Sequence, residues 1–144
     1  MKKITFLLIL VLYSANLSAQ KEAVQKTIET FFEGFHAKDP LKIKSTCSDA
    51  IILQSISENT KGNKLSNETA NAFYKSMAAI AADVQFEERI LSYNIQVDGS
   101  MAHVWMPYEF YVNGKKSHGG VNAFTLYLEG TTWKIIHLID TRRK

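Results

Sequence analysis

The sequence predicts an α+β domain in which N-terminal helices pack on a strongly curved, mainly antiparallel sheet and close a cone with an open mouth. Three observations carry this prediction. Residues 20–38 have the apolar spacing of an amphipathic helix, residues 100–143 have the pattern of three long strands with two tight turns between them, and the helical segments come mostly before the strands. Segregated helices and antiparallel strands bury one sheet face under the helices.

The first nineteen residues have the pattern of a cleavable signal peptide. Two lysines precede an apolar run over residues 4–13, and a mostly small and polar stretch ends at Ala19. A membrane anchor is the alternative, but the run is shorter than the ~20 residues that a spanning helix needs, and no cysteine follows it for a lipid anchor. We therefore expect residues 1–19 to be removed, residues 20–144 to form a single domain, and the mature protein to be periplasmic or secreted and free of the membrane.

The charge of the chain argues against nucleic acid as a partner. The formal charge is +3, with 17 basic and 14 acidic residues, and removal of the two lysines of residues 1–19 leaves 15 against 14, or +1. No basic helix and no interleaving of basic and aromatic residues remains. The last three residues, Arg142 to Lys144, are expected to form a solvated tail.

The single cysteine excludes an internal disulfide. Cys47 lies at the end of a predicted short helix, where a residue should be buried, and we expect it to be a small buried apolar side chain. A nucleophilic role would need a neighbouring base, which the sequence does not show.

Two helices are predicted at the start of the mature chain. Apolar side chains recur along one face of residues 20–38. They are Val24, Ile28, Phe31, Phe32 and Phe35. Asp39 should end this helix because the residue before a proline avoids the helical region, and Pro40 can begin a second helix that continues over residues 41–47.

The middle of the chain is expected to contain a strand, a loop, a helix and another strand. β-branched residues favour a strand over residues 51–57, and the polar residues 58–64 favour a loop. Ser66 or Asn67 can cap the next helix, whose apolar face includes Phe73 and Met77. Asn67 also begins a glycosylation sequon, and both interpretations stay open.

Residues 86–97 alternate as one half-buried strand. Leu91, Tyr93, Ile95 and Val97 fall on the apolar side, and Glu88 falls on the polar side. Tight turns follow at Asp98-Gly99, Asn113-Gly114 and Glu129-Gly130, which predicts an antiparallel meander to the end of the chain.

The period of two sorts the residues of the long strands into inward and outward sets. Phe124 and Leu126 suggest that the even positions of residues 116–129 face inward, so His118 and Asn122 also face inward, nearer the mouth. The more apolar set of residues 101–112 includes Tyr108 and leaves His103 outside. Pro107 lacks an N–H for the ladder and indicates a sheet edge or a bulge.

The last strand is ambiguous because both of its faces are apolar. Trp133, Ile135, His137 and Ile139 form one set, and Ile136, Leu138 and Asp140 form the other. This pattern is typical of a strand covered on both sides or of a dimer interface.

A concave apolar pocket with a few polar groups is the expected site. The candidate ligand-binding residues are Tyr108, His118, Asn122, Gln54 and either His137 or Asp140. His118 can shuttle a proton, Tyr108 can donate to a carbonyl, and Asp140 could act as a base if burial raises its pKa. Each of these three residues could instead be structural, either as part of the pocket wall or as a hydrogen-bonded side chain. No metal-site spacing and no phosphate-binding glycine loop is present, so we expect neither a metal nor a cofactor.

Several short motifs in the C-terminal segment occur together. They are Tyr108-x-Phe110, Asn113-Gly114, Ser117-His118-Gly119-Gly120, Phe124-x-Leu126, and Trp133-Lys134-Ile135 leading to Asp140-Thr141. This set resembles the lumazine-binding-like branch of the nuclear transport factor 2-like (SnoaL-like) superfamily. The resemblance implies a cystatin-like cone with a pocket and a homodimer formed through the outer sheet face. Gly119 stands where many members would have cysteine, and the paired aspartates and tyrosine of the steroid isomerases are not visible.

Three functions remain open. The first is a secreted domain that binds a small apolar or aromatic molecule without catalysis. The second is an isomerase, dehydratase or cyclase with His118 as acid/base and Tyr108 as hydrogen-bond donor. The third is a protein-interaction module with a vestigial pocket. We favour binding, because fold does not imply function and the enzyme constellation is incomplete.

Overall fold

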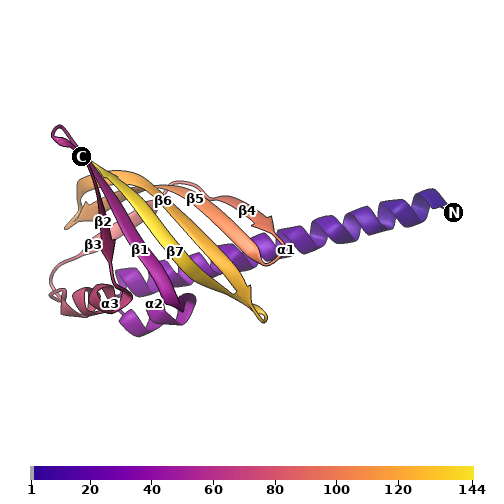
Figure 1. The fold of residues 1–144 in the computed structure, drawn as a ribbon, viewed down its shortest axis with the longest axis horizontal. Helices are drawn as coiled ribbons and strands as arrows, with labels where there is room; N and C mark the ends of the chain where they lie inside the picture. The colour runs from indigo at the N-terminus through magenta and orange to yellow at the C-terminus, as the bar shows by residue number, and fades with distance from the viewer. Residues whose placement is uncertain (1) are drawn as a thin grey trace.

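The molecule is a curved seven-stranded sheet with three helices packed against one of its faces (Figure 1). The structure is a computed structural model that describes the backbone of residues 2–144 and the side chains of residues 17–144. The predicted signal segment, residues 1–19, therefore lies largely outside the described side chains. Within the part of the chain that the structure describes, no helix has both the length and the apolar content of a bilayer span.

Helix α1 (Lys2–His36) supplies the apolar stripe that the sequence predicts. Val24 and Ile28 are fully buried, and Phe31 and Phe32 are nearly so. The N-terminal part of the helix extends beyond the sheet, whereas its C-terminal part lies across it (Figure 1).

Helix α2 (Pro40–Thr46) begins at the proline, as predicted. The Asp39 carboxylate caps it by accepting hydrogen bonds from the N–H groups of Leu41 and Lys42 at 3.0 and 3.1 Å. A Cβ on Gly34 would lie 2.9 Å from the Ile43 nitrogen, so only glycine lets α2 pack this closely on α1.

The segment after the first strand is a hairpin, which corrects the predicted loop. Strand β1 (Cys47–Asn59) is longer than expected, and it pairs antiparallel with β2 (Gly62–Glu68). The loop prediction is wrong because every residue of β2 is exposed, so the strand leaves no apolar alternation in the sequence.

Helix α3 (Ala70–Ala79) is capped two or three residues later than predicted. The Thr69 hydroxyl accepts a hydrogen bond from the Ala72 N–H at 3.2 Å, so neither Ser66 nor Asn67 is the cap. The predicted apolar face is confirmed, because Met77 is buried and Phe73 packs against the core.

The strand predicted over residues 86–97 is broken in two. Strands β3 (Phe86–Ile90) and β4 (Asn94–Asp98) both pair with the same edge of β5 (Met101–Val112). Ile90 pairs with Tyr108 and Asn94 pairs with Trp105. The three residues between β3 and β4 therefore lie opposite only two residues of β5. The Pro107 carbonyl accepts a hydrogen bond from the Leu91 N–H at 2.9 Å. Proline has no N–H to donate toward the same edge of β5, and the backbone hydrogen bonds between β5 and its neighbour are interrupted there.

The break reverses which residues face inward. Tyr93, Ile95 and Val97 pack against the core as predicted, but Leu91 is 60% exposed. Before the break, Phe86, Glu88 and Ile90 form the more buried set. The prediction that Glu88 faces outward is therefore wrong: Pro107 marked a bulge, but the extra residue lies in the partner strand.

Strands β6 (Lys115–Glu129) and β7 (Thr132–Arg143) complete the meander. The predicted turns are confirmed by positive φ angles of 48° at Asn113, 76° at Gly114 and 61° at Gly130. Strand β7 also pairs in parallel with β1, so the order is β2-β1-β7-β6-β5-β3, with β4 beside β5. The sheet is mixed but mainly antiparallel, which confirms the predicted fold class.

One extra residue in β7 resolves its ambiguous faces. Leu126 pairs with Ile135 and Thr125 with His137, so Ile136 is the additional residue. Trp133 and Ile135 are buried before this irregularity. After it, the inward set contains Leu138 and Asp140, so each predicted set faces inward over one half of the strand.

Candidate functional site

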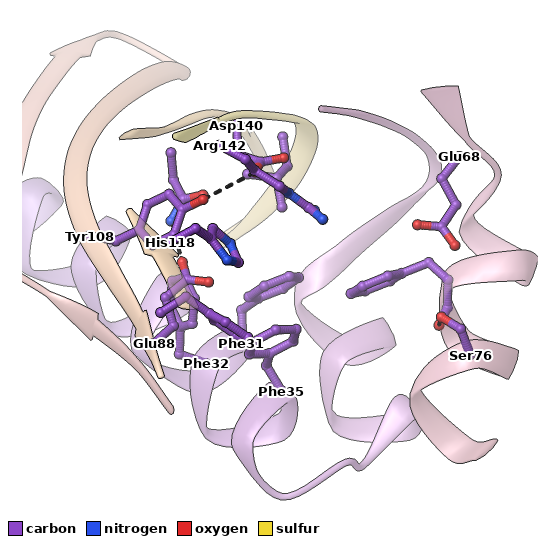
Figure 2. Close-up of a pocket in the computed structure, with 14 residues that line it drawn as sticks. Phe31, Phe32, Phe35, Glu68, Ser76, Glu88, Tyr108, His118, Asp140 and Arg142 are labelled. Carbon is purple, nitrogen blue, oxygen red and sulfur yellow. Dashed lines mark hydrogen bonds and ion pairs between the residues drawn. The ribbon is translucent and has the colours of Figure 1, made fainter. Parts of the chain in front are cut away.

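The inner face of the sheet and the two helices α1 and α3 enclose a cavity of about 280 Å³ near the mouth of the cone (Figure 2). Most of its wall is apolar. The apolar lining residues are Phe31, Phe32, Phe35, Phe73, Phe110 and Leu138. The polar lining residues are Glu68, Ser76, Glu88, Tyr108, His118, Asn122, Asp140 and Arg142.

Tyr108, Asp140 and Arg142 form a hydrogen-bonded group on one wall. The Tyr108 hydroxyl donates to the Thr141 carbonyl at 2.9 Å and lies 3.3 Å from Asp140 Oδ2. Arg142 Nε donates to the same Asp140 oxygen at 2.7 Å. Burial, with the nearby carboxylates of Asp140 and Glu88, raises the pKa of Tyr108 far above its usual value. Tyr108 is therefore a neutral hydroxyl at all physiological pH values.

Glu88 of β3 and Asn122 of β6 form a second polar pair, although β5 lies between their strands in the sheet. The Asn122 side-chain amide donates to Glu88 Oε1 at 2.5 Å, and Asn122 is 4% exposed. Burial raises the pKa of Glu88 to about 7, and the charge of Asp140 adds to this effect. The Asn122 hydrogen bond and Arg142 act in the opposite direction but do not outweigh it. Glu88 therefore exchanges a proton near neutral pH, as a general acid or base requires.

His118 lies between aromatic rings at the mouth of the cavity. Its ring stacks on Phe110 with centroids 4.9 Å apart and meets Tyr108 edge-on at 5.9 Å. Burial lowers the pKa of His118, and the charge of Arg142 lowers it further. The imidazole is therefore neutral at neutral pH, with Nδ1 placed 3.2 Å from the Ser117 hydroxyl.

The structure brings four of the predicted site residues together. Tyr108, His118, Asn122 and Asp140 all line the cavity, on three adjacent strands. The other two predicted residues do not line it.

Gln54 and His137 instead hydrogen-bond to each other at 3.0 Å. Gln54 also donates to the side chain of Asn67 at 2.8 Å. The extra residue in β7 is the physical reason for the correction at His137, because it turns Asp140, and not His137, toward the cavity.

Sequence reasoning missed Glu88, Arg142 and Glu68. Arg142 was expected in a solvated tail, but its side chain crosses the cavity wall beside Asp140 (Figure 2). Glu68 belongs to the hairpin that was expected to be a loop. The only available signal for Glu88 was Pro107, which predicted an irregularity but not the strand in which it occurs.

The described residues contain no group of three or more His, Cys, Asp and Glu side chains able to hold a metal ion. Cys47 is buried as predicted, and burial raises the pKa of its thiol. The titratable groups that line the cavity are the carboxyl groups of Glu68, Glu88 and Asp140, a neutral imidazole and a neutral phenol, together with the Arg142 guanidinium.

Comparisons with known proteins identify the fold. No family model matches the chain, and no curated protein matches it. Among solved structures, a nuclear transport factor 2-like protein from Cytophaga hutchinsonii is similar with a TM-score of 0.70 at 11% identity, covering 86% of this chain and 98% of the other.

Two further structures have names that mention an activity. A candidate dehydratase of the nuclear transport factor 2-like family from Streptomyces avermitilis has a TM-score of 0.67 at 14% identity, covering 88% and 98%. The beta subunit of a candidate aromatic-ring-hydroxylating dioxygenase from Novosphingobium aromaticivorans has a TM-score of 0.72 at 11% identity, covering 89% and 92%. These similarities establish architecture, not activity: the chain has the cystatin-like fold of the nuclear transport factor 2-like proteins.

Proposed function

We propose that this protein binds a small, largely aromatic or apolar molecule that presents one polar group to the Glu88–Asn122 pair. The observation that carries the proposal is an aromatic cavity of about 280 Å³ with this pair on its wall. Ligand sites are commonly concave and apolar, with a few polar groups that fix orientation.

The arrangement of the walls supports one ligand orientation. The phenylalanines of α1 and α3 lie on one side, and the polar groups of β3, β5, β6 and β7 lie on the other (Figure 2). A flat ring can therefore lie on the phenylalanines while its polar substituent reaches the sheet. An apolar molecule with no such substituent would leave Glu88 desolvated without a new partner, which is unfavourable.

Binding is tested by blocking the cavity. Protein purified from its own host is examined by native mass spectrometry for a retained small molecule, and 2-naphthol is titrated by calorimetry. Ser76 lines the cavity and is exposed, so Ser76→Trp should fill it and weaken 2-naphthol binding at least about tenfold, or 1.4 kcal/mol. Ala78→Trp, at an exposed position of the same helix that does not line the cavity, is the control. Absence of binding to the unmodified protein contradicts the proposal.

A second candidate function is proton-transfer catalysis of the isomerase, dehydratase or cyclase type. The specific observation is the pKa of Glu88 near 7, which suits a general base at neutral pH. Glu88 then takes the acid/base role first expected of His118, while Tyr108 and His118 supply hydrogen bonds. Solvent deuterium exchange into 2-tetralone, followed by NMR, provides a direct test. Exchange should rise with pH through about 7 and be lost in Glu88→Gln, and exchange at the buffer rate in the unmodified protein removes this candidate.

We also propose that residues 1–19 are a signal peptide and that the mature protein is periplasmic or secreted. The sequence pattern supports this proposal, and Val24, the first buried side chain among residues 17–36 of α1, lies beyond the expected cleavage site. N-terminal sequencing of the mature protein should begin at Gln20.

We propose further that the protein forms a homodimer through the outer sheet face and belongs to the lumazine-binding-like branch. Exposed apolar side chains on the sheet support the homodimer, because Trp105 and Ile52 are 51% and 55% exposed. The Ser117-to-Gly120 motif supports membership of the lumazine-binding-like branch. Sedimentation should give a dimer that Trp105→Glu dissociates.

A further inference from the structure

The charged groups of the cavity do not balance. Three carboxyl groups line it, those of Glu68, Glu88 and Asp140, against one cation, Arg142. Arg142 Nε is already bonded to Asp140 at 2.7 Å, so these two form a neutral pair. Glu88 has a neutral amide partner, and Glu68 forms no ion pair within residues 17–144. The remaining charge of the wall is therefore negative.

Glu88 has one oxygen available to a ligand. Its Oε1 accepts the Asn122 hydrogen bond, and no bond is formed to Oε2 within the described part of the chain. Yet no buried side-chain nitrogen or oxygen there lacks a partner, so Oε2 must be accessible from the cavity. Figure 2 shows the Glu88 carboxylate below His118, on the side of the cavity where the phenylalanine rings of α1 lie.

Three of the phenylalanine rings that line the cavity lie in nearly parallel planes. Phe31 stacks on Phe35 with centroids 6.5 Å apart and on Phe73 at 6.4 Å, with interplanar angles of 11° and 5°. The faces of aromatic rings carry partial negative charge and attract cations. Glu88 and Glu68 lie on opposite sides of the cavity (Figure 2), so the rings and the carboxylates favour the same sign of ligand charge.

An anionic ligand is less compatible with this wall. It would require a free cation, whereas Arg142 already neutralises Asp140. It would also lie near Glu88, whose ionisation it would oppose. A neutral ligand would gain ring contacts but no charge interaction.

We propose that the cavity binds a small organic cation, specifically an aromatic or apolar amine, with its ammonium group on Glu88 Oε2 and against the phenylalanine rings. This inference rests on the proposed binding function and names its ligand class. The ammonium replaces lost water by donating to the carboxylate, and the apolar part of the ligand covers the remaining ring surface.

The pH dependence follows from the groups around Glu88. It faces Asn122 and His118 of β6, Tyr108 of β5, and Asp140 and Arg142 of β7, and its backbone N–H donates to Nε2 of His36 on α1 at 3.0 Å. Since burial raises the pKa of Glu88 to about 7, the acid is largely protonated at pH 6 and ionised at pH 8. Affinity for an amine should therefore rise between pH 6 and pH 8, a range in which the amine itself stays protonated.

The experiment compares three probes of one shape: 2-naphthylmethylamine, 2-naphthalenemethanol and 2-naphthoate. Calorimetry on the whole protein at pH 6 and pH 8, in buffers of different ionisation enthalpy, gives both affinity and proton release. We expect the amine to bind at least about tenfold more tightly than the alcohol at pH 8. At pH 7 amine binding should release protons, because the ammonium lowers the pKa of Glu88.

Glu88→Gln should reduce amine affinity at least about tenfold and remove its pH dependence, with alcohol affinity changed less than about threefold. Glu87→Gln, at the exposed neighbouring position, is the matched control and should change neither affinity. Equal or tighter binding of the alcohol or the naphthoate overturns the cation proposal but leaves the proposed binding function intact. Failure of all three probes to bind overturns both.

Discussion

The inner faces of the closed end and the open end of the cone are built from the same strands, but they have opposite chemistry. At the closed end Val104, Leu126 and Ile135 are completely buried. At the open end the corresponding strands carry Tyr108, Asn122 and Asp140 inward. The difference shows that the sheet serves as a core over one half of its length and as a site over the other.

The change from core to site coincides with two irregularities of the sheet. One is the break between β3 and β4, and the other is the extra residue Ile136 of β7. Each irregularity reverses the inward set of its strand. Glu88 and Asp140 thereby face the cavity, although each lies in a sequence where an uninterrupted period of two would place it outside.

The largest expected effect is at the closed end. Leu126→Ala should reduce the free energy of unfolding by about 2–5 kcal/mol, because Leu126 is 0% exposed and the surrounding strands cannot collapse onto the space it leaves. Urea unfolding measures the loss. Leu65→Ala, the same substitution at a position that is 54% exposed, should change stability by less than about 0.5 kcal/mol. Similar losses in both variants would mean that the closed end is not the stabilising half.

Glu88→Gln should have the opposite effect and stabilise the protein above pH 7. The pKa of Glu88 is about 7 when folded and 4.5 as the ordinary value, so between these pH values the folded chain holds a proton that the unfolded chain has lost. Stability therefore falls as pH rises from 4.5 to 7, by up to about 3 kcal/mol, and stays lower above 7. Glutamine keeps an oxygen for Asn122 and cannot ionise.

Chemical denaturation at pH 4 and pH 8 measures this effect. The two proteins should be equally stable at pH 4, and the variant should be more stable at pH 8. Glu87→Gln, whose carboxylate is exposed and paired with Arg89, should show no such gain. If Glu88→Gln is no more stable than the unmodified protein at pH 8, Glu88 is not desolvated, and the open end does not lower the stability of the fold.

Local pattern was sufficient for much of the site. Phe124 and Leu126 predict that His118 and Asn122 of the same strand face inward, and the apolar set of residues 101–112 predicts the same for Tyr108. The α1 stripe and the three turns were predictable for the same reason, since helical periodicity and glycine-containing turns are properties of adjacent residues.

Glu88 could not be predicted because its direction depends on a partner strand. Pro107 removes a donor from β5, and the consequence appears in β3 and β4, which lie earlier in the chain. The hairpin strand β2 was missed because it is exposed throughout, and Arg142 because parallel pairing of β7 with β1 is not visible in local sequence. The placement of each of these residues depends on pairing between segments that are distant in the sequence.

The smallest of the three expected effects tests how closely β7 approaches β6 at the open end. A Cβ on Gly120 would lie 1.8 Å from the Thr141 carbonyl oxygen, which also accepts the Tyr108 hydrogen bond. A Cβ on Gly119 would lie 3.1 Å from its nearest atom, the Tyr108 carbonyl oxygen. Neither glycine has a positive φ angle, so the two alanine variants differ in steric contact and not in backbone strain.

Gly120→Ala should therefore cost about 1–3 kcal/mol of stability, as an overpacked position, and Gly119→Ala should cost less. Because the new methyl group pushes β7 away, Gly120→Ala should also separate Asp140 from Tyr108 and weaken 2-naphthylmethylamine binding, whereas Leu126→Ala should leave that binding nearly unchanged. Urea unfolding and calorimetry of the three variants measure both quantities. Equal losses for the two glycine variants would show that β7 moves freely at the mouth, and the open end would then lack the fixed geometry that a binding site needs.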